Sequence, residues 1–174
     1  MKKAIPGRTL LSATQLRKRV KELGKEITAY YKDKPLTVVG LMNGSLFFLV
    51  DLMRELPIDT QIECWKISSY KGDKSSGKVE GLQSCTGDFH GREVLIMDDI
   101  LDTGLTLHEV CLRLQELGAR RIKICVLLKK RKKREVSVKA DWYGFEIGSE
   151  FVIGYGLDLD QRYRSLPMIR VLES

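Results

Sequence analysis

Several features are scarce or absent in this chain, and each scarcity excludes a class of protein. Two histidines and four cysteines are spread over 174 residues without a Cys-X-X-Cys pair, which argues against a zinc site. No apolar run approaches the roughly 18 residues of a membrane-spanning helix, and the amino-terminal stretch lacks the apolar segment of a signal peptide. We therefore expect no membrane association and a cytoplasmic location. The cysteines, expected there as buried and reduced thiols, are Cys64, Cys85, Cys111 and Cys125.

Basic residues are in excess, and they give the chain a formal net charge of +7. Such a balance favours anionic partners such as phosphates or nucleic acid, but it carries no information about fold. Much of the excess lies in the run KKRKKR at 129–134, which suits a nucleic-acid patch, a solvated loop or part of an anionic-substrate site. The length and the hydrophobic content of 43% predict one globular domain over residues 1–174.

Helical and strand-like patterns alternate along the chain. A capping box at 12–15 opens a helix whose apolar positions at 16, 20, 23, 27 and 30 share one face, which places Tyr30 in the core. At 60–67, Ile62 and Cys64 alternate with polar neighbours, as in a half-buried strand. The alternation of strands and helices predicts an α/β fold, a mainly parallel sheet flanked by helices, with a small hood formed by the terminal segments. Further helices are expected at 46–56 and 105–117, and strands at 36–41, 60–67, 81–85, 91–97, 121–128, 142–147 paired with 151–155, and 168–172.

The most informative segment is residues 94–107, VLIMDDILDTGLTL. A buried strand ends in two carboxylates, Asp98 and Asp99, and acids at the carboxyl end of a strand face the crevice where open α/β sheets bind ligands. The turn at Asp102-Thr103-Gly104 then leads into a helix, whose free N–H groups and dipole favour a phosphate. The plainer interpretation is a polar strand end with a turn and a helix cap. Aspartic proteases also use Asp-Thr-Gly, but two copies or two subunits supply their paired acids, whereas this chain has one copy preceded by an acidic strand end that those enzymes do not need.

This segment resembles the phosphoribosyl pyrophosphate (PRPP) signature of the type I phosphoribosyltransferases. Over residues 11–172 the chain is similar to the branch of that family that acts on hypoxanthine and guanine. The resemblance implies that Asp98 and Asp99 contact the ribose hydroxyls, although relatives usually have Glu before Asp. It also implies a 5′-phosphate loop formed by Asp102, Thr103, Gly104, Leu105 and Thr106.

Two further segments resemble parts of the family's pyrophosphate site and lid. Met42, Asn43 and Gly44 match the pyrophosphate loop, where the peptide bond between the first two positions is often cis. Many relatives carry a basic residue at the position of Asn43, which puts a charged contact there in doubt. Ser69 and Tyr70 open the polar stretch 68–78 and match a mobile lid, whose closure excludes water from the reacting centre. A disordered surface loop is the plainer interpretation of this stretch.

The purine site is implied by two more segments. Lys130 falls where the family places a lysine that donates to the purine 6-oxo group, although Lys129 beside it leaves the register open. Phe151 is expected to stack on the purine and Val152 to offer backbone groups to its edge. The resemblance implies that Asp158, together with Asp98 and Asp99, binds Mg²⁺. It also implies that Arg164 contacts pyrophosphate. The other reading of residues 151–158 is a buried aromatic strand with a polar end.

The reaction implied is transfer of 5-phosphoribosyl from PRPP to N9 of hypoxanthine or guanine, with Mg²⁺ as cofactor and with Asp102 as general base or acid. A homodimer or homotetramer in purine salvage is implied as well. Two alternatives stay open. One is a PRPP-sensing regulator that binds nucleic acid through the basic run, which the purine-site residues disfavour. The other is a phosphoribosyltransferase that prefers another base. Lys130 disfavours adenine, whereas nothing excludes xanthine, and the preference between hypoxanthine and guanine is open.

Overall fold

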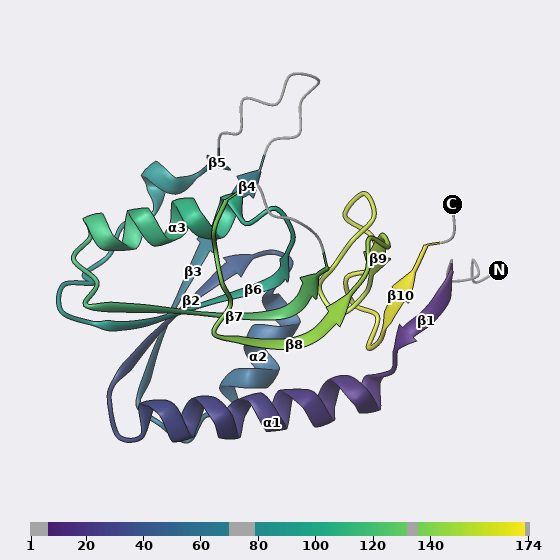
Figure 1. Cartoon of the computed structure of the whole chain (residues 1–174), viewed down its shortest axis with the longest axis horizontal. Coiled ribbons are helices and arrows are strands. Elements are labelled where there is room, and N and C mark those ends of the chain that lie inside the picture. Colours follow the sequence, from purple (N-terminus) through teal and green to yellow (C-terminus); the bar gives the residue numbers. More distant parts are fainter. Residues whose placement is uncertain (1–6, 70–78, 132–135, 173–174) are drawn as a thin grey trace.

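A five-stranded parallel sheet forms the centre of the protein (Figure 1). The computed structural model describes residues 7–69, 79–131 and 136–172. Its central strands follow the order β3-β2-β6-β7-β8, and every neighbouring pair is parallel, so all carboxyl ends meet at one edge. The central strands are strongly apolar because helices cover both faces of the sheet. The strands are β2 (Leu36–Met42), β3 (Thr60–Lys66), β6 (Glu93–Leu101), β7 (Arg121–Lys130) and β8 (Trp142–Ile147).

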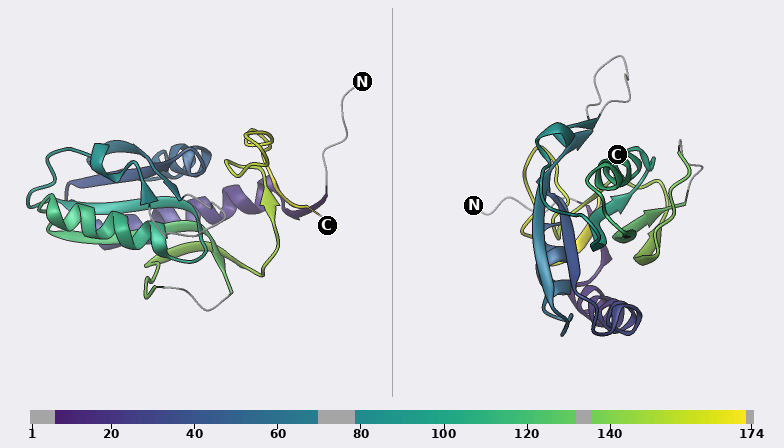
Figure 2. Two further views of the ribbon diagram at one scale, coloured as in Figure 1. Left: turned by 90° about the horizontal axis from the view of Figure 1, so that it is seen from above. Right: turned by 90° about the vertical axis from the view of Figure 1, so that its left-hand side faces the viewer.

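Helices α1 (Ala13–Tyr31) and α2 (Leu46–Met53) cover one face of the sheet, and α3 (Leu105–Glu116) covers the other (Figures 1 and 2). The sheet therefore separates two apolar cores. The capping box that opens α1 is confirmed, because the Ser12 side chain accepts from the Gln15 N–H at 3.3 Å and the Gln15 side chain accepts from the Ser12 N–H at 2.9 Å. Among the described residues, no helix combines the length and the apolar character that crossing a bilayer requires.

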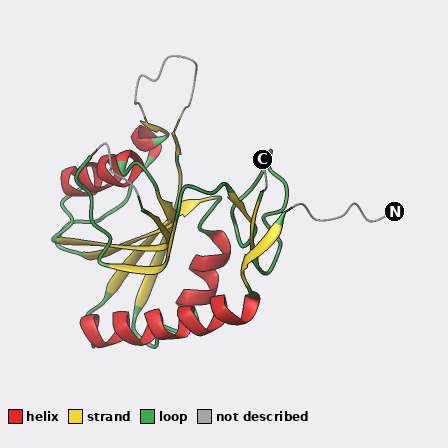
Figure 3. Ribbon diagram, turned by 45° about the vertical axis from the view of Figure 1, so that its right-hand side comes forward, coloured by secondary structure: helices red, strands yellow, loops and turns green. Residues whose placement is uncertain are grey.

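The expected hood is a three-stranded antiparallel sheet in the order β1-β10-β9, and it stands beyond the carboxyl ends of the central strands (Figure 3). Its strands are β1 (Arg8–Leu11), β9 (Val152–Ile153) and β10 (Ile169–Val171), so both terminal segments contribute, as predicted. Two short strands, β4 (Ser68–Ser69) and β5 (Val79–Glu80), pair antiparallel beside the central sheet, and the 3-10 helix η1 (Leu82–Ser84) follows them.

Some expected elements differ in the structure. The segment 81–85 contains the 3-10 helix η1 rather than a strand, because Gly81 takes a left-handed conformation with φ of 93° and turns the chain. Strand β8 pairs with β7 in the central sheet, whereas β9 pairs with β10 in the hood, so 142–147 and 151–155 are not partners. The helix expected at 46–56 ends at Met53. Between there and Pro57 the backbone forms tighter hydrogen bonds, in which each N–H bonds the carbonyl three residues earlier.

The expected faces were wrong at three positions. Tyr31 rather than Tyr30 enters the core of α1, since a helix of 3.6 residues per turn brings residue 31 as close to the buried stripe as residue 30. Ile62 and Cys64 are exposed on β3, which is an edge strand with a neighbour on one side only. Of the other thiols, Cys85 and Cys125 are buried as expected, and Cys111 is partly buried.

Candidate active site

A cavity of about 680 Å³ opens at the carboxyl ends of the central strands, beneath the hood. It gathers most of the residues that the sequence predicted from separate segments. Those that line it are Met42, Asn43, Gly44, Asp98, Asp99, Asp102, Thr103, Gly104, Thr106, Asp158 and Arg164. Leu105, Lys130, Phe151 and Val152 lie outside the lining. The side chain of Ser69 and the whole of Tyr70 lie outside the described residues, so the predicted lid cannot be placed.

The acidic pair lies inside strand β6 rather than after it, because the strand continues to Leu101. Asp98 and Asp99 are partly buried, and the Asp98 carboxylate accepts the Asp99 N–H at 2.9 Å. Burial and the neighbouring negative charge raise the pKa of Asp98 well above its usual value. Burial also raises the pKa of Asp99, while its hydrogen bonds and the charge of Arg164 oppose the rise. This edge of the sheet therefore holds negative charge that a cation would neutralise.

The turn after β6 presents an open helix end to the cavity. Gly104 has a φ of 89°, and it precedes α3 without a side-chain cap and without an acid in the first turn. Thr103 Oγ1 accepts the Leu105 N–H at 3.3 Å, which orders the turn. The remaining first-turn N–H groups have no partner within the helix, and together with the helix dipole they form a site suited to a phosphate.

The loop after β2 is packed tightly against the acidic pair. Its Met42–Asn43 peptide bond is cis, as the family resemblance implies. Ser45 is buried and donates to the Leu41 carbonyl at 2.6 Å, which closes the turn before α2. A Cβ on Gly44 would collide with the Asp99 carboxylate, and a Cβ on Gly156 would collide with the Gly44 carbonyl. Glycine is needed at both positions because backbone and carboxylate approach this closely.

The third wall of the cavity comes from the segment after β9. Arg164 donates to the Gly156 carbonyl at 2.6 Å and forms an ion pair with Asp158 at 2.8 Å. Gln161, which the sequence analysis missed, donates its N–H to Asp158 at 2.8 Å and accepts from Arg164 at 3.0 Å. In the sequence, its position between Asp158 and Arg164 was the only indication that it belongs to the site. These contacts hold one carboxylate and one guanidinium at the cavity mouth.

Two neighbouring lysines on β7 have different partners. The Lys130 ammonium lies 3.3 Å from an Asp102 carboxylate oxygen. Lys129 forms an ion pair with Glu146 at 2.7 Å and lies over the Tyr143 ring at 4.5 Å from its centroid. Lys130 is therefore the lysine next to the signature loop. In the hood, the Phe151 ring is 54% exposed, whereas Val152 is buried in β9.

The donor set of the cavity fits a hard divalent cation. Among the residues that the structure describes, no group of three His, Cys, Asp or Glu side chains is placed to enclose a metal ion. The adjacent carboxylates of Asp98 and Asp99, with the raised pKa of each, offer oxygen ligands in a setting that favours a positive charge. Mg²⁺ typically takes only one or two carboxylates from a protein and completes its shell with substrate oxygens and water.

Comparison with known proteins gives consistent relatives. Residues 8–160 match the model of the phosphoribosyl transferase domain. A hypoxanthine-guanine phosphoribosyltransferase of Aquifex aeolicus is 42% identical over 166 residues, which cover 94% of this chain and 93% of that protein. A hypoxanthine phosphoribosyltransferase of Haemophilus influenzae is 42% identical over 166 residues, or 92% of each chain. The crystal structure of a hypoxanthine-guanine phosphoribosyltransferase from Bacillus anthracis superposes with a TM-score of 0.91 at 34% identity, covering 97% of this chain and 100% of that one.

Proposed function

The chain belongs to the phosphoribosyltransferase family and to its hypoxanthine-guanine branch, and from this premise we propose how its residues act. It is a pentosyltransferase of purine salvage that transfers 5-phosphoribosyl from PRPP to N9 of hypoxanthine or guanine. The C1–pyrophosphate bond breaks, the C1–N9 bond forms, and pyrophosphate leaves. One observation supports the residue assignments most strongly: a single cavity gathers the loop at Gly44, the acids of β6, the turn at Gly104 and the Asp158–Arg164 pair.

The phosphates of PRPP are proposed to bind at two ends of the cavity. The 5′-phosphate meets the N–H groups from Thr103 to Thr106, with the α3 dipole behind them. The pyrophosphate lies against Met42, Asn43 and Gly44, and the Arg164 guanidinium donates to it. Arg164 reaches it by loosening its bond to the Gly156 carbonyl or its pairing with Asp158. Fixing both ends of the substrate positions C1 between them, and positioning is a large part of catalysis in such a transfer.

Asp98 and Asp99 are proposed to orient the ribose hydroxyls. Mg²⁺, when bound, supplies charge neutralisation of the pyrophosphate as it departs. Asp98 and Asp99, together with Asp158, are the carboxylates that would hold the cation through oxygen or water. Asp98 is one methylene shorter than the glutamate usual in relatives, so its contact is expected to be longer or to pass through water.

Asp102 and Lys130 are proposed to handle the purine. In the structure they pair with each other, at 3.3 Å. On purine binding, the Lys130 ammonium donates to the 6-oxo group, which selects 6-oxopurines over adenine. The Asp102 carboxylate is then released to accept a proton at N7 as N9 attacks C1. Phe151, exposed in the hood, supplies a ring to stack on the base, and Val152 supplies backbone groups to its edge.

The remaining assignments are proposed from the same resemblance. Residues 1–174 form a single phosphoribosyltransferase domain that acts in the cytoplasm. Ser69 and Tyr70 begin a lid that excludes water during transfer. The part of the basic run that the structure describes supports an ion-paired surface rather than a nucleic-acid site, because Lys129 and Arg131 both pair with Glu146. The relatives named above are enzymes, so neither a regulator nor a xanthine-preferring enzyme is favoured.

We also propose that the chain forms a homodimer or homotetramer through α2. Leu46, Phe47 and Val50 are large apolar side chains exposed on this one short helix, and adjacent exposed apolar residues mark association surfaces. The helix follows directly from the loop at Gly44, so association would also steady the pyrophosphate site.

The decisive experiment is pyrophosphate release from PRPP and Mg²⁺ with hypoxanthine, guanine, xanthine or adenine, for the wild type and Asp102→Asn. We expect rapid release with hypoxanthine and guanine, slow release with xanthine and none with adenine. Loss of the general base is expected to slow release on the order of 10²- to 10⁴-fold. Absence of release with every base, in protein that still binds PRPP, would reject the enzymatic function. An unchanged rate in Asp102→Asn would reject only the role of that residue.

A further inference from the structure

The segment between β9 and β10 contains a two-residue turn, and this segment lies next to the carboxyl ends of the central strands (Figure 1). Leu159 and Arg162 flank the turn and exchange two backbone hydrogen bonds, at 3.2 Å and 2.9 Å. The central residues, Asp160 and Gln161, have φ of 49° and 62°, and two positive φ values are the mark of a type I′ turn. Positive φ suits glycine, asparagine and aspartate better than glutamine, so Gln161 is held in a costly conformation. Residues in such conformations cluster at functional sites, which points to the Gln161 side chain.

The two central residues of the turn differ in what their side chains meet. Gln161 lines the active-site cavity together with Asp158 and Arg164, whereas Asp160 is exposed outside that lining. The Asp160 carboxylate has no hydrogen bond or ion pair with any residue that the structure describes. Only Gln161 of this turn is therefore in a position to affect a ligand in the cavity.

Gln161 is linked to both charged residues at the cavity mouth. Its amide oxygen accepts from Arg164 Nη2 at 3.0 Å, and the same nitrogen lies 2.8 Å from Asp158 Oδ1. Its backbone N–H donates to the other carboxylate oxygen, Asp158 Oδ2, at 2.8 Å. The second terminal nitrogen, Arg164 Nη1, donates to the Gly156 carbonyl at 2.6 Å. Both terminal nitrogens are thus held, and since a guanidinium is planar, these acceptors fix its orientation.

We propose that Gln161 is a positioning residue for the pyrophosphate group of PRPP and that it acts through Arg164. The inference rests on the proposed function, in which Arg164 donates to pyrophosphate while its bond to Gly156 or its pairing with Asp158 loosens. Gln161 stays as the fixed acceptor during this exchange. Without it, Arg164 Nη2 keeps only Asp158, and the guanidinium turns toward that carboxylate. A side chain that is already oriented loses less conformational entropy on binding, so the Gln161 contact favours PRPP.

This role predicts an effect that depends on the ligand. PRPP and pyrophosphate carry the group that meets Arg164, whereas hypoxanthine and IMP lack it. Loss of the Gln161 acceptor should therefore raise KM for PRPP and Kd for pyrophosphate, and it should leave KM for hypoxanthine and Kd for IMP unchanged. A general disturbance of the loop would weaken IMP as well, because IMP binds in the same cavity.

The test combines steady-state kinetics with PRPP and hypoxanthine and calorimetric titration with IMP or with pyrophosphate and Mg²⁺, for the wild type and Gln161→Asn. Asparagine keeps the amide and suits positive φ better, but it is one methylene shorter and does not reach Arg164. We expect KM for PRPP and Kd for pyrophosphate to rise on the order of tenfold, with the constants for hypoxanthine and IMP within about twofold of the wild type. Gln161→Glu keeps an acceptor oxygen at full reach, so its KM for PRPP should stay within about threefold of the wild type.

Two controls distinguish the possible failures. Asp160→Asn places the same residue at the neighbouring position of the turn, outside the cavity, and should leave all four constants unchanged. In an Arg164→Gln background, Gln161→Asn should have no further effect, because its influence passes through Arg164. An unchanged KM for PRPP in Gln161→Asn, an equal weakening of IMP, or a full additional effect in the Arg164→Gln background would overturn the proposal. If Arg164→Gln alone leaves PRPP and pyrophosphate binding unchanged, the pyrophosphate role of Arg164 in the proposed function is wrong, and this inference fails with it.

Discussion

Two adjacent lysines on β7 allow the catalytic role of one side chain to be tested separately from the effect of surface charge. Side chains of consecutive strand residues point to opposite faces, so Lys130 meets Asp102 while Lys129 meets Glu146 and the Tyr143 ring. We predict that Lys130→Gln lowers kcat/KM for hypoxanthine on the order of a hundredfold, because the 6-oxo group loses its charged donor. Steady-state kinetics with hypoxanthine and guanine would measure the loss.

Lys129→Gln is the matched control, since it makes the same substitution one position earlier. Its kcat/KM is expected to stay within about twofold of the wild type, because a partly exposed ion pair contributes little. Equal losses in the two variants would show that positive charge near β7, rather than donation from Lys130 to the 6-oxo group, supports the reaction.

The thiols differ in exposure, and this difference predicts their reactivity. Cys64 is exposed on the edge strand, whereas burial, followed by the charge of Asp141, raises the pKa of Cys111 to about 11. At pH 8 we predict one rapid reaction per chain with a disulfide reagent, and Cys64→Ser should abolish it. A raised pKa leaves little thiolate below it, so the slower reaction of Cys111 should accelerate about tenfold per pH unit between pH 8 and 10.

The corresponding control is Cys111→Ser, which should remove the pH-dependent phase and leave the rapid one. A rapid phase that persists in Cys64→Ser would mean that another thiol is accessible. Burial also raises the pKa of Cys85 and of Cys125, so both are expected to react last.

Single residues could be predicted where their chemistry is local. The acids, the glycine turn and the threonines of 94–107 lie in one cavity because one strand-turn-helix unit carries them. The choice between Tyr30 and Tyr31 could not be made, because both lie near the edge of the buried stripe and the packing of Trp142 against them is a long-range contact. Gln161 was missed for the same reason, since its partners are set by the fold of the loop.

At the scale of elements, a hydrogen bond joins the segment that follows β9 to α2. The Tyr155 hydroxyl donates to Asp51 at 2.7 Å, and the Tyr155 ring lies 6.4 Å, between centroids, from that of Phe47. Burial, followed by this bond to Asp51, raises the pKa of Tyr155, so the hydroxyl stays protonated. We predict that Tyr155→Phe lowers the free energy of unfolding by about 1.5–3 kcal/mol, the range for hydrogen bonds to charged groups, as measured by urea denaturation.

A double-mutant cycle with Asp51→Asn tests whether that loss comes from this bond. The two substitutions together should cost little more than either alone, since both remove the same interaction. Tyr143→Phe, at a partly exposed tyrosine on β8, should change stability by less than about 0.5 kcal/mol. If the two losses in free energy of unfolding add fully, the contribution of Tyr155 comes from its packing rather than from this hydrogen bond.

Elements were easier to predict than their partners. The central strands and the helices follow from apolar runs, periodicity and caps, which are local signals, whereas strand β1 and the antiparallel pairing of the hood were not predicted. The pairing of β8 with β7, and of β9 with β10, depends on contacts between segments far apart in the chain, so periodicity could not distinguish it from a hairpin. Residues 81–85 carry a strand-like composition, but the positive φ of Gly81 ends the extended chain there.

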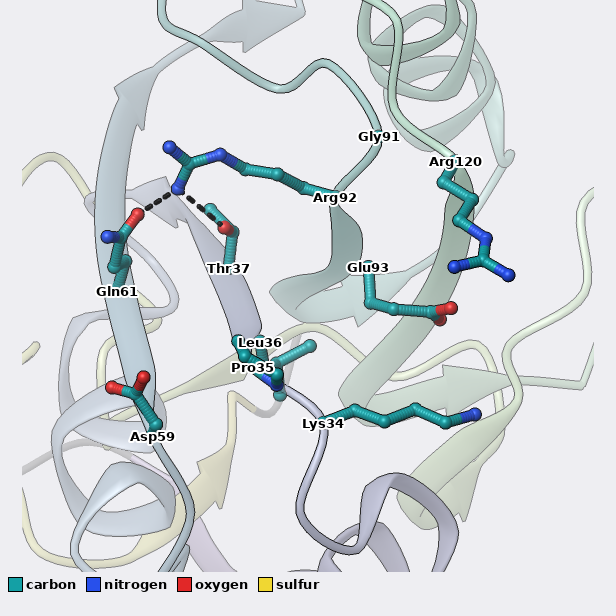
Figure 4. A pocket seen from close by; sticks show the side chains of 10 residues that line it. All are labelled: Lys34, Pro35, Leu36, Thr37, Asp59, Gln61, Gly91, Arg92, Glu93 and Arg120. Carbon is teal, nitrogen blue, oxygen red and sulfur yellow. Dashed lines mark hydrogen bonds between the residues drawn. The ribbon is translucent and has the colours of Figure 1, made fainter.

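At the scale of the whole molecule, parallel strands give the protein two chemically different ends. The carboxyl ends hold a carboxylate-rich cavity faced by an open helix end, while the amino ends hold a second cavity, lined by Glu93 and three cationic side chains (Figure 4). Arg121 and Glu93 are opposite each other in register on β7 and β6, so the second cavity is built on the same strands that position the acidic pair.

The helices on the two faces of the sheet also differ in how many large apolar side chains they expose, and this difference predicts that the face covered by α2 forms the interface. Val50 is 40% exposed on α2, and Leu112 is 42% exposed on α3 across the sheet, so the same substitution can be made on both faces. We predict that Val50→Lys raises the dissociation constant of the assembly at least about a hundredfold, because a lysine buried at an apolar interface has no partner. Light scattering after size-exclusion chromatography would measure this. Leu112→Lys should leave the mass of the wild-type assembly unchanged; a wild type that is monomeric at micromolar concentration, or a Val50→Lys protein that still assembles, would exclude α2 as the interface.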